Sequence, residues 1–370
     1  MADGAHATPV PSRPAPATES AHHSRHALRI ARGHLRKRLL KLAGYLVVVY
    51  LVVKLLPGLE EALSSLERVS WEWVVVAVAI EVLSETGFVT SWRAIVDPED
   101  LLSRDGRGER MGTRVAWAQL GGGMLVPGGS LSSVGVGAWI LHRFGMPTKL
   151  VAERQFNLSF LNTGIDALAL IAFGVGLASG IFPGEHKLTL TLLPAAVAAI
   201  AILTVLRIAR RAESYAARTH AKHPKLAVSI ETLARAVEDT RALLVHRDGL
   251  KSVLGALAYL GFDVLVLWSA FIAIHAHPAP GFAVVLMAYI IGALGGSLPL
   301  PAGVGAIGGM VGMLILYGVA HNAAVVTVLL YQAIGQLVPL IGGGIAYLFL
   351  RGKFGPIEAD QIPSRGDIVA

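Results

Sequence analysis

The sequence contains no cysteine and few charged residues. Without cysteine, the 370-residue chain can form no disulfide, thiolate nucleophile or cysteine-ligated metal site. Only 15% of the residues are charged, against about 25% in a typical soluble domain. The sequence also lacks a phosphate-binding P-loop, so we expect no use of ATP by this chain. Apolar residues dominate instead, at 54% of the chain with a mean hydropathy of +0.60.

The apolar residues are gathered in blocks that match the length of a bilayer-spanning helix. They predict an all-α polytopic membrane protein with about six full spans, at 42–57, 71–91, 151–181, 188–206, 252–275 and 323–349. The membrane domain covers 42–352. Residues 1–24, rich in Ala, Pro, Ser and His, are expected to be a disordered tail, and 353–370 a second tail.

Positive charge is concentrated between the apolar blocks. The net charge is +7, and the basic stretches are the juxtamembrane segment 25–41, the loop 93–114 and the loop 207–251, which is the most basic. The positive-inside rule places these stretches and both termini in the cytoplasm, so the expected location is the bacterial cytoplasmic membrane. This pattern favours contact with anionic lipid over binding of nucleic acid.

Two apolar segments are interrupted by proline and glycine: 115–141 at VPGGS and 282–317 at LPLPAGVG. A complete crossing by 115–141 would move the basic loop 207–251 outside. A re-entrant helical hairpin keeps every basic loop inside, because an arm of about 12 residues reaches only ~18 Å. The second segment then enters from the other side. The chain is thus predicted to hold two oppositely oriented re-entrant hairpins that form an inverted repeat, as in secondary transporters; the alternative is a chance likeness of Gly/Pro-rich segments.

Longer motifs around these breaks resemble a known family. LVPGGSLSSVG with HRFGM, and SLPLPAGVGAIGG with LYGVAHNAAVVTVLLYQAIGQLVPLIGG, resemble the flippase-like membrane domain of lysylphosphatidylglycerol synthases, over roughly 40–352. The resemblance implies a domain that is associated with moving an aminoacylated lipid across the bilayer. Two positions depart from the family pattern: Gly308 stands where a glutamate is usual, and Gln332 where an arginine is usual. We expect that relatives pair these two charges and that this chain has lost both partners, since one alone would leave a buried charge unpaired.

The breaks supply the first candidate substrate-binding residues. A half-helix that begins inside a membrane presents free backbone N–H groups and a positive dipole end, which favour phosphate. The candidates in the two hairpins are Pro127, Gly128, Gly129, Ser130, Pro301, Gly303 and Gly305. The alternative is that the breaks serve only close helix packing.

Polar side chains within the spans supply the others. Asp263 lies halfway along its span, where a bare charge costs at least ~2.5 kcal/mol; the alternative is a protonated or serine-paired structural carboxyl. Asp166 shares a helix face with Ser159, Asn162 and Thr163, which would line a groove or bond between helices. Further candidates are Arg154, either a phosphate ligand or an interfacial residue, and Tyr331 and Gln332, either on the substrate path or in packing.

Glu81 and Glu85 lie one helical turn apart in the second span. Two carboxyl groups at this spacing can share a proton, so they are candidates for proton coupling. The alternatives are that they line a wet cleft or pair with arginine.

The function that these features favour is a lipid flippase. An anionic or modified phospholipid headgroup, or a polyprenyl-linked lipid, would pass through a polar groove between the hairpins. The alternatives are a secondary transporter for ions or small solutes, and a membrane-embedded lipid- or glycosyl-transfer enzyme. The enzyme ranks last, because Asp166 and Asp263 are candidate acids but the sequence shows no paired metal-ligand motif. We expect no enzyme activity, cofactor or metal. A lipid-synthesising enzyme is an expected partner that the loop 207–251 would dock.

Overall fold

The computed structural model describes residues 69–103, 110–125, 130–184, 187–212, 224–245, 247–276, 278–295 and 304–354. All of them belong to one compact unit, Gly58–Ala370. Within these ranges the chain forms α-helices and one short 3-10 turn, η2 (Leu101–Ser103), with no strand. The predicted tails, the basic segment 25–41 and the first span 42–57 lie outside the described residues, apart from the start of the last tail.

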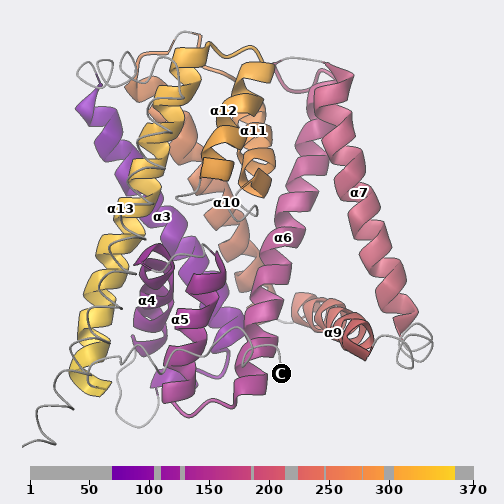
Figure 1. Cartoon of the computed structure of the whole chain (residues 1–370), viewed down its shortest axis with the longest axis vertical. Helices are drawn as coiled ribbons and strands as arrows, with labels where there is room; N and C mark the ends of the chain where they lie inside the picture. Colours follow the sequence, from indigo (N-terminus) through magenta and orange to yellow (C-terminus); the bar gives the residue numbers. More distant parts are fainter. Residues whose placement is uncertain are drawn as a thin grey trace, which may run out of the picture. The chain divides into compact units, whose positions relative to one another are not determined.

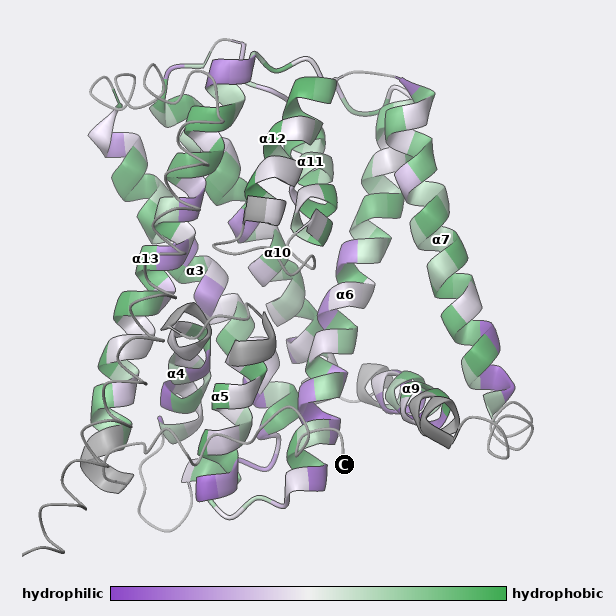
Figure 2. Ribbon diagram, viewed as in Figure 1, coloured by the Kyte–Doolittle hydropathy of each residue, from purple (hydrophilic) through white to green (hydrophobic). Residues whose placement is uncertain are grey.

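Five helices are long and apolar enough to cross a membrane: α3 (Trp71–Val96), α6 (Thr148–Ala178), α7 (Leu188–Arg210), α10 (Arg247–Ala273) and α13 (His321–Phe354). They confirm the five predicted spans that fall within the described ranges. Hydrophobic residues make up much of the length of these helices (Figure 2), and many of their large apolar side chains are exposed. Leu193 in α7 is 63% exposed and Leu348 in α13 is 65% exposed, which suits contact with lipid tails.

Helices α3 and α10 form the most closely packed pair. They run antiparallel, because the N–H of Ser70 donates to Ala273 at one end and the hydroxyl of Ser84 donates to the Tyr259 carbonyl further along. Glycine allows this approach at the crossing. A β-carbon on Gly255 would lie 2.6 Å from the backbone nitrogen of Ser91, a distance that no real side chain tolerates. The pair therefore packs backbone against backbone, as small residues permit in membrane helices.

Four short helices form two antiparallel pairs: α4 (Met111–Leu125) with α5 (Ser130–Arg143), and α11 (Phe282–Gly295) with α12 (Val304–Leu316). Each helix has 13 to 15 residues, or roughly 20–23 Å at 1.5 Å per residue, which is less than the bilayer core. The two pairs lie toward opposite ends of the long helices (Figure 1). This arrangement agrees with the predicted hairpins in length and placement, whereas their re-entry into a membrane and the inverted repeat stay predictions.

Glycine also brings the short helices close to their neighbours. A β-carbon on Gly121 of α4 would lie 2.7 Å from the α-carbon of Gly343 in α13. In the other pair, a β-carbon on Gly295 of α11 would collide with the carbonyl of Gly305 in α12. Gly305, one of the candidates at the helix breaks, therefore packs closely against α11.

A buried polar network joins three of the helices. The indole N–H of Trp92 in α3 donates to the side-chain oxygen of Gln119 in α4 over 2.8 Å. The amide of Gln155 in α6 donates to the same oxygen over 2.8 Å, and Gln119 donates back over 3.1 Å. All three side chains are at most 2% exposed. Because hydrogen bonds between buried side chains are strong, these bonds fix the relative positions of α3, α4 and α6.

The basic segment 207–251 was predicted as a loop, but much of it is helical. Helix α9 (Pro224–Val245) contacts α6, α7 and α10 and lies across the lower end of the view (Figure 1). Its apolar residues recur at three- and four-residue intervals, at Leu226, Ile230, Leu233 and Val237, which is the period of an amphipathic helix. The segment was predicted as a loop because of its many basic residues, although its apolar residues already had this helical period.

Candidate functional site

Three buried carboxyl groups lie within electrostatic range of one another where α3 and α10 pack together. Glu81 and Glu85 in α3 are each 3% exposed, and Asp263 in α10 is 7% exposed. The register that joins Ser84 to Tyr259 places Glu81, one turn earlier in α3, across from Asp263. Each acid lies in the middle part of its helix, away from both ends.

Two tyrosines hold Asp263 from other helices. The hydroxyl of Tyr289 in α11 donates to Asp263 Oδ2 over 2.5 Å, and the hydroxyl of Tyr331 in α13 also bonds this carboxyl group. The two rings meet edge to face with their centroids 6.1 Å apart. Asp263 and Tyr331, both candidates from sequence, therefore lie together, and tyrosines rather than serine are the partners of the aspartate.

Asp166 extends the cluster toward α6. Its carboxyl group is half-buried and within electrostatic range of Asp263. Along the same helix, Asn162 is half-buried with its side-chain oxygen unpaired, while Ser159 and Thr163 are exposed. The predicted polar stripe thus runs from the buried acids to an exposed face of α6. We name the acids Glu81, Glu85, Asp166 and Asp263, with Tyr289 and Tyr331, the acid–tyrosine cluster.

The cluster has no positive partner among the described residues. The ion pairs in these ranges involve Arg93, Arg154 and Arg235, which bond other acids. Three buried oxygens, Glu81 Oε2, Glu85 Oε2 and Asp263 Oδ1, have no hydrogen-bond partner. The described ranges also contain no set of three His, Asp or Glu side chains close enough to hold a metal ion. No arginine among the described residues pairs with Glu81 or Glu85, so the arginine pairing that the sequence left open stays a prediction.

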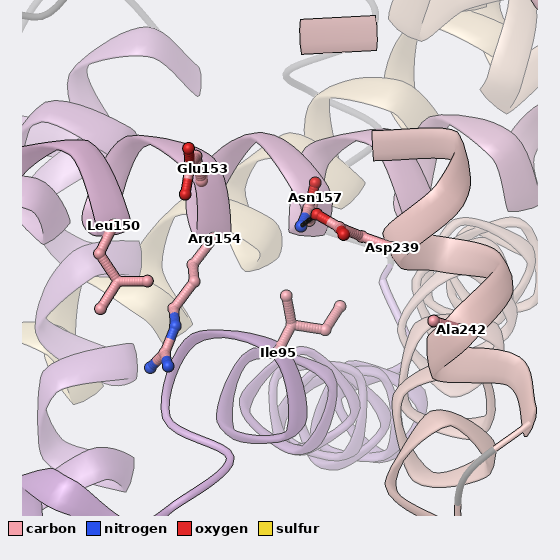
Figure 3. Close-up of a pocket in the computed structure, with 7 residues that line it drawn as sticks. All are labelled: Ile95, Leu150, Glu153, Arg154, Asn157, Asp239 and Ala242. Atoms are coloured by element: carbon pink, nitrogen blue, oxygen red, sulfur yellow. Dashed lines mark hydrogen bonds between the residues drawn. The ribbon is translucent and has the colours of Figure 1, made fainter. Parts of the chain in front are cut away.

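Arg154 lies apart from the cluster, in a polar cavity near the lower end of α6. Its guanidinium donates to the Val96 carbonyl over 2.8 Å and to Glu99 over 3.0 Å. The cavity, of about 350 Å³, is shown in Figure 3 with the residues that line it: Ile95, Leu150, Glu153, Arg154, Asn157, Asp239 and Ala242. Asn157 donates to Asp239 across it over 2.9 Å, which ties α6 to α9.

Arg154 contacts the turn that follows α3, and Asp97 stabilises this turn. Asp97, directly after α3, accepts a hydrogen bond from the Leu101 N–H over 2.8 Å and so fixes the turn η2. Burial raises the pKa of the Asp97 carboxyl, while the N–H bonds from Leu102 and Leu101 act in the opposite direction. Arg154 therefore binds a preformed loop, and its present contacts are those of a structural residue.

We expect Arg154→Ala to lower the stability of the protein by about 1–3 kcal/mol, because the charged donor and two hydrogen bonds are lost. The measurement is unfolding by SDS in mixed micelles, followed by circular dichroism. Arg235→Ala is the matched control. The Arg235 side chain is 60% exposed and its ion pairs are at the surface, so its loss should be nearly neutral. Equal effects of the two substitutions would contradict the structural role.

The candidates at the helix breaks are only partly covered by the structure. Pro127, Gly128, Gly129, Pro301 and Gly303 lie outside the described residues. Ser130 and Gly305 are the first residue of α5 and the second of α12. Their backbone N–H groups thus belong to first turns, which have no partner within the helix.

Gln332 is half-buried in α13, where it accepts a hydrogen bond from Gln336 over 3.2 Å. Gly308, the other position that departs from the family pattern, is exposed in α12 with open space where a side chain would stand.

Sequence reasoning missed Tyr289 and the Gln119–Gln155 network. Tyr289 stands in the apolar run FAVVLMAYIIGALG, where it is the only residue with a hydroxyl. A hydroxyl in such a run is a signal, because a buried tyrosine oxygen usually finds a partner. Gln119 and Gln155 gave a similar signal as amides within apolar segments.

These features define a class: a multi-pass helical membrane protein with a buried polar cluster formed by residues of α3, α6, α10, α11 and α13. Residues 39–343 match the family described as the lysylphosphatidylglycerol synthase TM region. The chain belongs to this family, as its motifs predicted. No curated protein matches the sequence.

Proposed function

We propose that the protein is a lipid flippase that moves an anionic or modified phospholipid headgroup across the cytoplasmic membrane. The observation that carries the proposal is the family match over 39–343, combined with a polar cluster buried among the membrane helices. The headgroup would pass along the polar face of α6 and the cluster, while the acyl tails stay in the lipid. The chain would act as a transporter and not as an enzyme.

The short pairs would enter the membrane from opposite sides as re-entrant hairpins. In this topology both termini face the cytoplasm. The described basic residues support it, because those at the end of α3, the start of α4, the end of α5 and the start of α6 are at one end of the helices: Arg93, Arg110, Arg114, Arg143 and Lys149. The first turns of α5 and α12 would then offer N–H groups to a phosphate near the midplane.

A lipid-synthesising enzyme is the partner that we propose. It would deliver newly made lipid at the end of the bundle where α9 lies. The polar cavity between α6 and α9 provides an accessible surface there, and the segment that carries α9 is strongly basic.

The test is a flipping assay with the purified protein in liposomes that hold a fluorescent anionic phospholipid in both leaflets. A membrane-impermeant quencher should remove the signal of the outer leaflet alone in empty liposomes, and that of both leaflets when the protein flips the lipid. We expect Asp263→Asn to slow the second phase, because it alters the buried centre of the path. Glu72→Gln, at an exposed position of α3, should leave it unchanged. A protected inner pool for anionic, aminoacylated and polyprenyl-linked probes alike would refute lipid flipping.

An ion or small-solute transporter is the second candidate. The observation that favours it is the group of buried acids without a described positive partner, which suits a cation. Uptake of a labelled cation by liposomes that leave the inner lipid pool protected would support this function over the first.

A further inference from the structure

We propose that the acid–tyrosine cluster is a proton-binding site, in which Glu81 and Glu85 carry exchangeable protons and Asp263 is the ionised partner. That these protons are exchanged during transport rests on the proposed function. The binding of protons does not, because it follows from the burial, contacts and charges of the described residues.

The first step concerns solvation. Glu81, Glu85 and Asp263 are almost fully buried in the middle of apolar helices, and each has an oxygen with no donor. Ionised carboxylates in such a place are costly unless they are paired and hydrogen-bonded. No arginine, lysine or histidine of the described residues pairs with them. A proton removes the charge of one acid and turns an acceptor oxygen without a donor into an O–H donor.

The second step concerns the choice of ligand. A metal ion needs several converging ligands, and the described residues offer no such set. An organic ammonium group needs space, whereas the three acids are at most 7% exposed. A proton needs neither converging ligands nor an open cavity. It is therefore the cation that fits the arrangement as it stands.

The third step assigns the protons. Asp263 accepts hydrogen bonds from the hydroxyls of Tyr289 and Tyr331, and donors of this kind favour the ionised form of an acceptor. Glu81 and Glu85 receive no such bond at their buried Oε2 atoms. Protons on the two glutamates and a negative charge on the aspartate leave the three groups with a single charge in place of three.

The assignment includes every titratable group among the described residues that acts on the cluster. They come from each helix that packs around Asp263: Glu81 and Glu85 of α3, Asp166 of α6, Tyr259 of α10, Tyr289 of α11 and Tyr331 of α13. All are acids or phenols, so none of them supplies a positive charge.

The fourth step is an exchange route. Asp166 is half-buried and within electrostatic range of Asp263, while Thr163 and Ser159, one and two turns before it in α6, are exposed. A proton that passes from the three buried acids to Asp166 therefore reaches a group with access to the surface. Asp166 is the residue that we assign to carry protons between the buried acids and the exterior.

The test is infrared spectroscopy of the purified protein in lipid nanodiscs, titrated with acid and base in light and heavy water. A protonated carboxyl group gives a C=O stretching band that ionised carboxylates lack and that shifts on deuteration. We expect this band in the wild-type protein at neutral pH, where exposed acids are ionised. Glu81→Gln and Glu85→Gln should each reduce it, and Asp166→Asn should slow its deuteration without removing it. Glu238→Gln, at an exposed position of α9, is the control and should leave the band unchanged.

Several results would overturn the proposal. The absence of the band from the wild-type protein at neutral pH would do so without any variant, so the test survives if a substitution impairs folding. A band that persists in the Glu81→Gln, Glu85→Gln double variant would place the protons elsewhere. Its loss on addition of sodium ions alone would show that the site takes a metal cation.

A second measurement separates this inference from the proposed function. Liposomes that contain the protein and a trapped pH-sensitive dye are assayed for proton movement and for lipid flipping in parallel. With the infrared band present, flipping that a pH gradient accelerates supports coupling. The same band without any flipping would retain the proton site and refute the flippase. Flipping by a protein that lacks the band would support the flippase and refute the proton site.

Discussion

Replacing Gly255 by alanine will destabilise the protein by about 3 kcal/mol, because the added methyl group has no space between α3 and α10. A β-carbon at this position would lie 2.6 Å from the Ser91 nitrogen and 2.8 Å from the Gly87 carbonyl oxygen. Both neighbours are backbone atoms, which cannot move aside as a flexible side chain can. The two helices must therefore separate along their length. Unfolding by SDS in mixed micelles, followed by circular dichroism, measures the change.

Gly261→Ala is the matched control on the same helix. A β-carbon there would meet nothing within 4 Å, so the substitution should be neutral or stabilise α10 by up to about 1 kcal/mol through helix propensity. Because Asp263 lies on α10, Gly255→Ala should also disturb the acid–tyrosine cluster, and Gly261→Ala should not. Similar stabilities for the two variants would show that the helices are less closely packed than the structure describes.

Replacing Gln119 by leucine will lower the stability by about 2–4 kcal/mol, because two buried groups lose their partners. Gln119 accepts from the indole N–H of Trp92 and from the amide of Gln155, each over 2.8 Å. Leucine is similar in size but accepts no hydrogen bond, so both donors remain buried and unpaired. The loss should appear in the same SDS titration and as a change in the fluorescence of the buried indole.

Two further variants test this explanation. Gln336→Leu changes an exposed glutamine of α13 and should alter stability by no more than about 0.5 kcal/mol. Trp92→Phe in the Gln119→Leu background removes one unpaired donor and should recover part of the loss. If the second substitution adds to the loss in full, the hydrogen bond is not its cause.

The long helices could be predicted from sequence because length and apolar composition suffice to define a span. The five spans within the described ranges begin and end close to the predicted boundaries. The interrupted segments could also be recognised, since proline and glycine mark where a helix cannot continue. Helix α9 was missed because the charges of its segment were interpreted only as a sign of membrane topology. The helical period was already present in the sequence, at Leu226, Ile230, Leu233 and Val237.

The candidate site could be predicted only in part. Asp263, Asp166 and Glu81 were recognisable, because an acid within an apolar span is rare. Their proximity was not, since it depends on the register between α3 and α10, which close contacts of Gly87 and Gly255 determine. Many glycines occur in this sequence, and nothing in the pattern distinguishes those at a crossing from those with open space around them, such as Gly308. Only the packed structure makes that distinction.

The glycine contacts also determine which parts of the molecule can move independently. Helices that touch through backbone atoms cannot slide past one another, so α3 with α10, α4 with α13, and α11 with α12 each behave as a rigid body. Each of these rigid bodies contributes one residue to the cluster: Asp263 from α10, Tyr331 from α13 and Tyr289 from α11. The hydrogen bonds among these three residues connect the bodies. A change in the charge of Asp263 would therefore alter the hydrogen bonds that connect the three rigid bodies. The binding of one small ion at this carboxyl group would then shift whole helices relative to one another.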